Sequence, residues 1–160
     1  MARRLGMIEW ALVVVQSISQ RRLPSAAGKE KTKMAGERIL IVEDDMDLAD
    51  TLKTVLESAG YNVSTAVNRE DAWEKVNESR PDLAILDVML DTLAEGIQLA
   101  GEFRRDEGLK EMPIVMLTAI NQRLALKIEP DGEEGYLPVD EFMEKPADPD
   151  KLLKVVARLL

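Results

Sequence analysis

The residues most able to do chemistry in this chain are carboxylates that follow short apolar segments. Asp87 closes the run Leu83-Ala84-Ile85-Leu86, and Glu43-Asp44-Asp45 follows Ile39-Leu40-Ile41-Val42. A near-continuous apolar run of this kind predicts a parallel strand that is buried on both faces. An acid at the end of such a strand lies at the carboxyl edge of the sheet, where open α/β folds bind ligands. Taken alone, Asp87 is better interpreted as a helix cap or a turn residue.

Polar groups also follow two later apolar segments. Thr118 follows Ile114-Val115-Met116-Leu117, and Lys145 follows Glu141-Phe142-Met143-Glu144. If the strands are parallel, several carboxylates, a hydroxyl and an ammonium group meet at one edge. Clustered carboxylates repel one another unless a cation neutralises them, and oxygen ligands favour a hard ion such as Mg²⁺ or Mn²⁺. A carboxylate can also attack phosphorus to form an aspartyl phosphate, so the set indicates metal-assisted phosphoryl transfer.

Composition restricts the chemistry further. The 160 residues include no cysteine and no histidine, which excludes thiolate catalysis, disulfides and phosphohistidine on this chain. The formal charge is −9 overall. Residues 1–35 carry seven basic and two acidic side chains, a net of +5, so the remainder carries −14. Such an acidic body argues against nucleic-acid binding, which needs clustered Lys and Arg, but suits a divalent cation.

Helical and strand periodicities alternate from residue 36 onward, and this predicts a parallel sheet with helices on both faces. Gly60 is expected to end the first helix, Asn68 to cap the second, and Asp148 with Pro149 to open the last. The expected strands cover 39–42, 61–67, 82–90, 114–117 and 141–144. The expected helices cover 47–59, the segment after 68, 96–105 and the segment after 148, and 122–128 is a weaker helical candidate.

Residues 1–35 differ from the rest and are predicted to be an N-terminal extension. Leu5, Ile8, Leu12 and Val15 recur at helical spacing, which favours an amphipathic helix followed by a linker over 25–36. Such a helix could dock on the body, form a homodimer or touch a membrane surface, or it could have no role. The apolar run is too short to span a bilayer.

Four segments carry a resemblance to a known family. Residues 39–45, Leu86-Asp87-Val88-Met89-Leu90, Leu117-Thr118-Ala119 and Glu144-Lys145-Pro146, taken in order, resemble the receiver domain of two-component response regulators. The resemblance covers residues 36–160. It implies a flavodoxin-like α/β domain with five parallel strands in the order 2-1-3-4-5, located in the cytoplasm.

The resemblance also implies a role for individual residues. Asp87 matches the phosphoacceptor. Asp44 matches a direct Mg²⁺ ligand, Glu43 a ligand acting through water, and the backbone carbonyl of Met89 a further ligand. Thr118 and Phe142 match the switch hydroxyl and the switch aromatic, and Lys145 matches the lysine that pairs with phosphate.

Three features depart from the family pattern. The loop after Asp87, residues 90–96, lacks the usual proline and is about one residue longer than is common. The interval from Thr118 to Lys145 is several residues longer than usual, with a turn-rich stretch at 129–140. The last helix is expected to end at Leu160, and no output domain is expected to follow it.

The sequence therefore predicts a stand-alone receiver rather than an ordinary enzyme. It would take a phosphoryl group from a histidine kinase or phosphotransfer protein onto Asp87 and pass the signal to a downstream protein that the sequence does not identify. The alternative is an interaction module with the same fold that signals without phosphorylation. A carboxylate-based phosphatase is disfavoured because Met89 stands where such enzymes need a second acid.

Overall fold

A computed structural model describes residues 36–92, 95–119 and 138–160. The expected N-terminal amphipathic helix, the weak helix at 122–128 and most of the turn-rich stretch at 129–140 lie outside these ranges. The elements, in chain order, are β1 (Arg38–Val42), α2 (Met46–Ser58), β2 (Asn62–Ala66), α3 (Arg69–Glu78), β3 (Leu83–Asp87), α4 (Glu95–Arg105), β4 (Ile114–Thr118), β5 (Glu141–Glu144) and α6 (Pro149–Leu159).

The five strands form one parallel sheet in the order β2-β1-β3-β4-β5, which confirms the expected fold. The central strands β3 and β4 are buried at every position. Both faces of the sheet are covered, which explains why these strands are continuous apolar runs rather than alternating ones. β5 pairs only with β4 among the described strands and is the shortest of the five.

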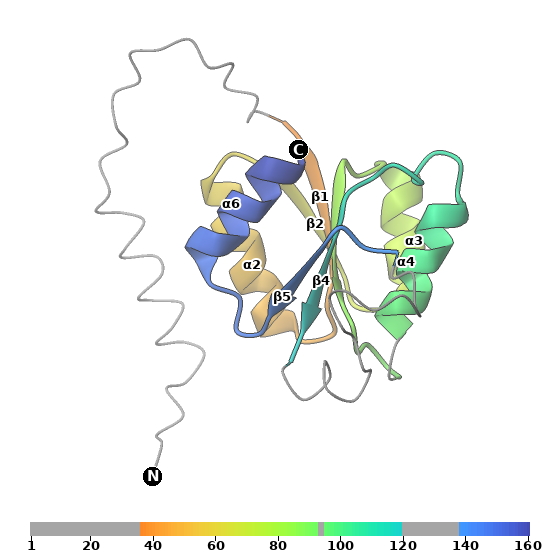
Figure 1. Ribbon diagram of the computed structural model, residues 1–160, viewed down its shortest axis with the longest axis horizontal. Coiled ribbons are helices and arrows are strands. Elements are labelled where there is room, and N and C mark those ends of the chain that lie inside the picture. Colours follow the sequence, from red (N-terminus) through yellow and green to blue (C-terminus); the bar gives the residue numbers. More distant parts are fainter. Residues whose placement is uncertain (1–35, 93–94, 120–137) are drawn as a thin grey trace.

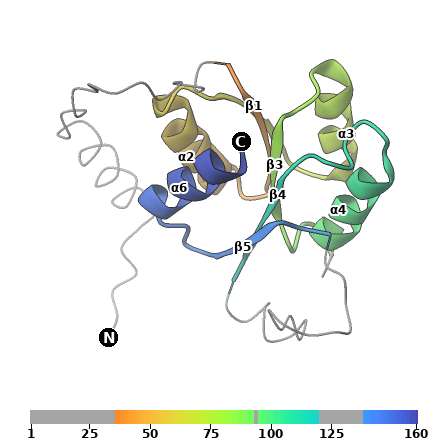
Figure 2. The ribbon, with the colours of Figure 1, turned by 45° about the horizontal axis from the view of Figure 1, so that its top comes forward.

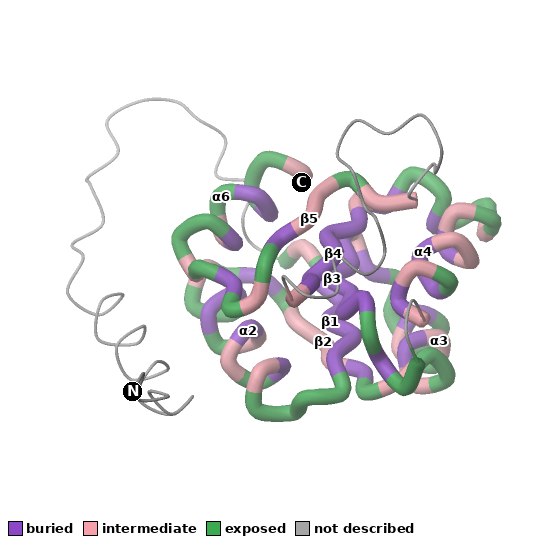
Figure 3. The backbone as a smooth tube through the Cα atoms, turned by 60° about the horizontal axis from the view of Figure 1, so that its bottom comes forward, coloured by how far each residue is buried: buried purple, intermediate pink, exposed green. Residues whose placement is uncertain are grey.

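The helices lie in two layers. α2 and α6 cover one face of the sheet, and α3 and α4 cover the other (Figures 1 and 2). Side chains alternate along each strand, so the sheet separates two apolar cores. Ile39 and Ile85 belong to the core beneath α2 and α6, whereas Leu40 and Leu86 belong to the core beneath α3 and α4. Figure 3 shows the buried strands enclosed between partly exposed helices.

Side-chain caps fix where three helices begin. Asp45 accepts hydrogen bonds from the backbone amides of Asp47 and Leu48, Asn68 accepts one from Asp71, and Asp148 accepts one from Lys151. These bonds satisfy amides that have no partner inside the helix. Gly60 follows α2 with a φ of 97°, a left-handed conformation that glycine adopts without strain. The predicted caps at Asn68 and Asp148 and the stop at Gly60 are confirmed.

The boundaries differ from the predictions by a few residues. β3 ends at Asp87 and not at Leu90. The Val88 amide still donates to the Leu117 carbonyl at 2.9 Å, but the Val88 carbonyl accepts from Gly96 at the start of α4. β4 includes Thr118 as its last residue. Asp87 and Thr118 are therefore the final residues of their strands, not the first residues beyond them.

The edge strand β5 is held at both ends. Before it begins, the Asp140 carboxylate accepts from the guanidinium of Arg104 at 2.7 Å and from the Ile114 amide at 2.8 Å. Arg104 also donates to the Met112 carbonyl at 2.6 Å, so it ties α4 to the segment before β4. Beyond the last residue of β5, the Lys145 amide donates to the Thr118 carbonyl at 2.9 Å. The peptide bond that follows, between Lys145 and Pro146, is cis.

None of the helices in the described part of the chain has the length and apolar character needed to span a bilayer.

Candidate functional site

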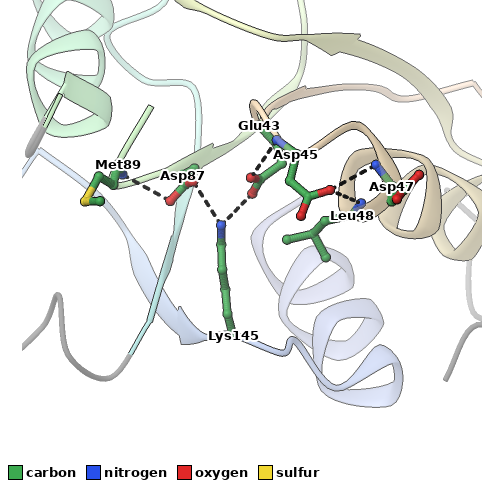
Figure 4. A network of polar contacts seen from close by, with 7 residues as sticks. All are labelled: Glu43, Asp45, Asp47, Leu48, Asp87, Met89 and Lys145. Atoms are coloured by element: carbon green, nitrogen blue, oxygen red, sulfur yellow. Dashed lines mark hydrogen bonds and ion pairs between the residues drawn. The ribbon is translucent and has the colours of Figure 1, made fainter. Parts of the chain in front are cut away.

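The polar groups predicted to gather at the carboxyl edge of the sheet do so. β1 leads directly into Glu43, β3 ends at Asp87, β4 ends at Thr118, and β5 leads into Lys145. Figure 4 shows Lys145 entering from β5 with its amine between the carboxylates of Glu43 and Asp87. Because the strands are parallel, side chains more than one hundred positions apart in sequence share one site.

Three carboxylates form an acidic cluster at this edge. Carboxylate oxygens of Glu43, Asp44 and Asp87 all lie within 4.8 Å of one another. Glu43 and Asp87 are only 1% and 3% exposed, whereas Asp44 is exposed. The cluster thus has a buried floor and an open side. An all-oxygen donor set with one solvent-facing side fits Mg²⁺, which binds a few carboxylates and keeps waters or phosphate oxygens in its remaining positions.

Lys145 bridges the two buried acids. Its Nζ lies 2.7 Å from Glu43 Oε2 and 2.9 Å from Asp87 Oδ2. One ammonium faces two buried carboxylates, with Asp44 close by, so negative charge exceeds positive charge. A buried cluster with an uncompensated charge is costly, and it either holds a proton or binds a cation.

The ionisation of the cluster reflects this imbalance. Burial is the largest influence on Glu43 and, together with the neighbouring charge of Asp87, raises its pKa to about 7 although Lys145 donates to it. Burial alone would lower the pKa of Lys145, but its hydrogen bonds to Glu43 and Asp87 outweigh burial and raise it. Lys145 therefore keeps its charge, and Glu43 takes up a proton more readily than an ordinary glutamate does.

The remaining predicted site residues surround the cluster. Thr118 is fully buried, and its hydroxyl donates to the Ala119 carbonyl at 3.1 Å. The Met89 amide donates to Asp87 Oδ1 at 3.1 Å, while its side chain is exposed. Phe142 is partly buried and packs against the core beneath α3 and α4.

Asp45 has a different place from the one its position suggested. Sequence reasoning grouped it with Glu43 and Asp44 as a candidate acid of the site, but its carboxylate caps α2 by accepting from two helix amides at 3.0 and 3.1 Å. Figure 4 shows Asp45 directed at Asp47 and Leu48, away from Lys145. The physical reason is that an acid directly before a helix is the acceptor nearest to the unpaired amides of its first turn.

Sequence reasoning did not find the contact between the start of α4 and the phosphoacceptor candidate. The amide of Gly96 donates to the Val88 carbonyl at 3.1 Å, immediately after Asp87. The Glu95 carboxylate accepts from the amides of Asp91 and Thr92 at 3.0 and 3.2 Å. An acid followed by glycine at the start of a helix was the signal available in the sequence. Part of the unusual loop, residues 93–94, lies outside the described residues.

The fold and this site together define a class of protein, the flavodoxin-like signalling domains with an acidic pocket and a lysine at the carboxyl edge. Residues 39–157 match the response regulator receiver domain family, and the chain belongs to that family.

Related proteins support this assignment. The chain is 38% identical over 128 residues to the phosphate regulon transcriptional regulatory protein PhoB of Pseudomonas aeruginosa, covering 79% of this chain and 51% of that protein. It is 35% identical to the alkaline phosphatase synthesis transcriptional regulatory protein PhoP of Bacillus subtilis, covering 78% and 48%. The chain thus spans about half the length of these curated relatives.

Solved structures show the same fold. The response regulator TrrA of Thermotoga maritima, crystallised in complex with Mg²⁺-BeF, is 31% identical with a TM-score of 0.64, covering 78% of this chain and 99% of that one. The chemotaxis response regulator CheY4 of Vibrio cholerae is 26% identical with a TM-score of 0.64, covering 79% and 100%.

Proposed function

We propose that this receiver domain, residues 36–160, accepts a phosphoryl group on Asp87 from a histidine kinase or phosphotransfer protein. A carboxylate oxygen of Asp87 forms the new bond to phosphorus, the bond from phosphorus to the donor's imidazole nitrogen breaks, and the imidazole leaves carrying a proton. The observation that carries the proposal is the position of Asp87, which is buried, lies in the acidic cluster and is hydrogen-bonded to Lys145. In this function the chain catalyses only its own phosphorylation and dephosphorylation.

Mg²⁺ is the metal that the donor set fits best. Glu43, Asp44 and Asp87 would hold it, Glu43 through water, and the Met89 carbonyl would complete the protein's share. When bound, the ion neutralises the carboxylates and the phosphoryl oxygens that develop charge during transfer. The raised pKa of Glu43 supports this part of the proposal, because burial and the neighbouring charge of Asp87 disfavour its anion and a bound cation would relieve both.

Lys145 and Thr118 are the donors available to a phosphoryl group on Asp87. Lys145 already contacts the Asp87 carboxylate, so it would pair with the phosphoryl oxygens after a small movement. The Thr118 hydroxyl would exchange its bond to the Ala119 carbonyl for one to phosphate. Because the Lys145 amide is bonded to the Thr118 carbonyl, both shifts act on β5, which carries the proposed switch residue Phe142.

The surface around the site suits a protein partner. The large apolar side chains with the highest exposure among the described residues are Met46, Val67 and Met89, which follow β1, β2 and β3 respectively. Each of them follows a strand end at the edge of the sheet that carries Asp87. A phosphoryl donor that reaches Asp87 would cover this edge. The stand-alone arrangement, the cytoplasmic location, the unnamed downstream partner and the role of residues 1–35 remain predictions.

Acetyl phosphate with Mg²⁺ tests the proposal. Intact-mass analysis of the wild-type chain should show one phosphoryl adduct that hydroxylamine removes, because an acyl phosphate is cleaved by this nucleophile. Asp87→Ala should abolish the adduct, whereas Asp91→Ala, which removes an exposed acid four positions later, should retain it. An adduct undiminished in Asp87→Ala would refute the assignment. No adduct on the wild-type chain would favour the alternative, an interaction module that signals without phosphorylation.

A further inference from the structure

Gly96, the second residue of α4, lies against the backbone of Asp87. A Cβ atom at Gly96 would stand 1.7 Å from the Asp87 carbonyl oxygen, 2.8 Å from its carbonyl carbon and 3.1 Å from the Val88 Cα. All three are backbone atoms, so no side chain could swing aside to make room. The first turn of α4 is therefore in direct contact with the peptide that carries the proposed phosphoacceptor.

Hydrogen bonds hold the same segment from both sides of this contact. The Gly96 amide donates to the Val88 carbonyl at 3.1 Å, and the Glu95 carboxylate accepts from the Asp91 and Thr92 amides. The Met89 amide in turn donates to the Asp87 carboxylate at 3.1 Å. These hydrogen bonds therefore fix the backbone between Asp87 and Thr92 against the start of α4.

α4 is itself held in place, because its inner face is fully buried. Leu99, Ala100 and Phe103 are 0% exposed in the core beneath α3 and α4. A helix packed in this way does not shift without loss of core contacts. A side chain at position 96 would therefore displace the Asp87–Val88 peptide, the helix or both.

We infer that Gly96 is a positioning residue for the phosphoryl-transfer site. The absence of a side chain lets α4 hold the Asp87–Val88 peptide in the one place where the Asp87 carboxylate meets Glu43, Asp44 and Lys145. The inference rests on the proposed function. It assigns to α4 a part in setting metal affinity and transfer rate, separate from its part in the core.

Gly96→Ala and Gly101→Ala in the full-length chain form a matched pair. Both add one methyl group to α4, but a Cβ at Gly101 meets nothing within 4 Å outside its own stretch of helix. We expect Gly96→Ala to weaken Mg²⁺ binding about tenfold by calorimetry, a typical effect of losing support for metal ligands. The rate of adduct formation from acetyl phosphate at saturating Mg²⁺ should fall by a similar factor of about ten. Gly101→Ala should match the wild type in both measurements.

Val156→Ala separates positioning from stability. Val156 is a fully buried residue of α6, on the opposite face of the sheet from α4, so its truncation should lower the melting temperature without changing Mg²⁺ affinity. If Gly96→Ala loses stability but retains wild-type Mg²⁺ affinity and rate, the inference is overturned while the proposed function stands. If the wild-type chain itself forms no adduct, the proposed function fails first.

A measurement on the wild-type chain covers the case in which Gly96→Ala does not fold. In ¹H–¹⁵N NMR spectra, Mg²⁺ should shift the amide signal of Gly96, because that amide is bonded to the segment that holds Asp87. The amide of Gly101, five positions along the same helix, should stay in place. Equal responses from the two glycines would overturn the inference.

Discussion

Two clusters of acids and donors in the described part of the chain are built in opposite ways. In the carboxyl-edge cluster (Glu43, Asp87 and Lys145), one ammonium serves two buried carboxylates. In the helix brace (Arg69, Trp73 and Glu102), one carboxylate serves two donors. There Glu102 accepts from Arg69 Nε at 3.0 Å and from Trp73 Nε1 at 3.1 Å, which links α3 to α4.

The pKa values of the two acids move in opposite directions because Glu43 is more deeply buried and Glu102 has more donors. Burial raises the pKa of Glu43, and Lys145 does not compensate fully. Burial also acts to raise the pKa of Glu102, but hydrogen bonds from Arg69 and Trp73 outweigh it and lower the pKa. The helix brace is a satisfied structural contact, reinforced by the edge-to-face packing of Trp73 on Phe103 at 5.1 Å. The carboxyl-edge cluster lacks positive charge, which is the property that a site for a cation requires.

Removing the cation from each cluster should give the largest difference. Lys145→Met leaves two buried carboxylates facing each other, and we expect it to cost about 3 kcal/mol of unfolding free energy at pH 8 without Mg²⁺. Arg69→Met should cost much less, because Arg69 is exposed and solvent screens its charge. Urea denaturation of both variants measures the difference. Equal losses would show that the two clusters do not differ in the way described.

Adding a cation should stabilise only the carboxyl-edge cluster. Mg²⁺ at about one hundred times its Kd should raise the unfolding free energy of the wild-type chain by about 2.7 kcal/mol relative to EDTA. Asp44→Asn should lose most of this gain because it removes the exposed acid of the site. Glu102→Gln, which alters the helix brace, should keep it. Thermal unfolding with and without Mg²⁺ measures the gain, and full stabilisation of Asp44→Asn would contradict the proposed ligand set.

The two acids should give opposite pH dependences without Mg²⁺. Between pH 4.5 and about 7 the folded state keeps the Glu43 proton that the unfolded state has lost, so the contribution of Glu43 to stability falls as pH rises through 7. The contribution of Glu102 is present above pH 4.5 and is lost as pH falls through its lowered pKa.

Glu43→Gln and Glu102→Gln test these two slopes. Relative to the wild type, Glu43→Gln should gain stability on the order of 1 kcal/mol between pH 5 and pH 8. Glu102→Gln should instead lose stability at neutral pH and approach the wild type in acid. Unfolding free energies at intervals of one pH unit provide the measurement. A wild-type slope that Glu43→Gln leaves unchanged would contradict the role given to burial.

Salt should have the smallest effect and should act on one cluster. Raising the ionic strength from 0.1 to 1 M shortens the screening length from about 10 Å to about 3 Å. The coupling between Arg69 and Glu102, measured by a double-mutant cycle, should fall because Arg69 lies at the surface. The coupling between Lys145 and Glu43 should hold, since Glu43 is 1% exposed. A salt-sensitive Lys145–Glu43 coupling would indicate that water reaches the buried floor of the site.

The apolar pattern was sufficient to predict a parallel sheet and the gathering of Asp87, Glu43, Thr118 and Lys145, while the order of the strands came from the family resemblance. Apolar runs mark buried parallel strands, and the topology then brings their ends together. The sequence could not separate Asp45 from its two acidic neighbours, because helix capping and metal binding use the same carboxylate. It could not show that Lys145 bridges Glu43 and Asp87, which depends on where β5 ends. The contact of Gly96 with Asp87 could not be predicted either, because the presence of a glycine in the sequence does not indicate which part of the backbone lies against it.

The way in which β5 is anchored limits how the edge of the sheet can move. Arg104 and Asp140 pin the strand just before it begins, and the bond from Lys145 to Thr118 pins it just after it ends. A strand of four residues fixed at both ends cannot slide along β4 without breaking one anchor. A displacement of Lys145 would instead bend or twist β5 between these two anchors. Phe142 lies within this span, so a displacement of Lys145 would change the backbone that carries Phe142.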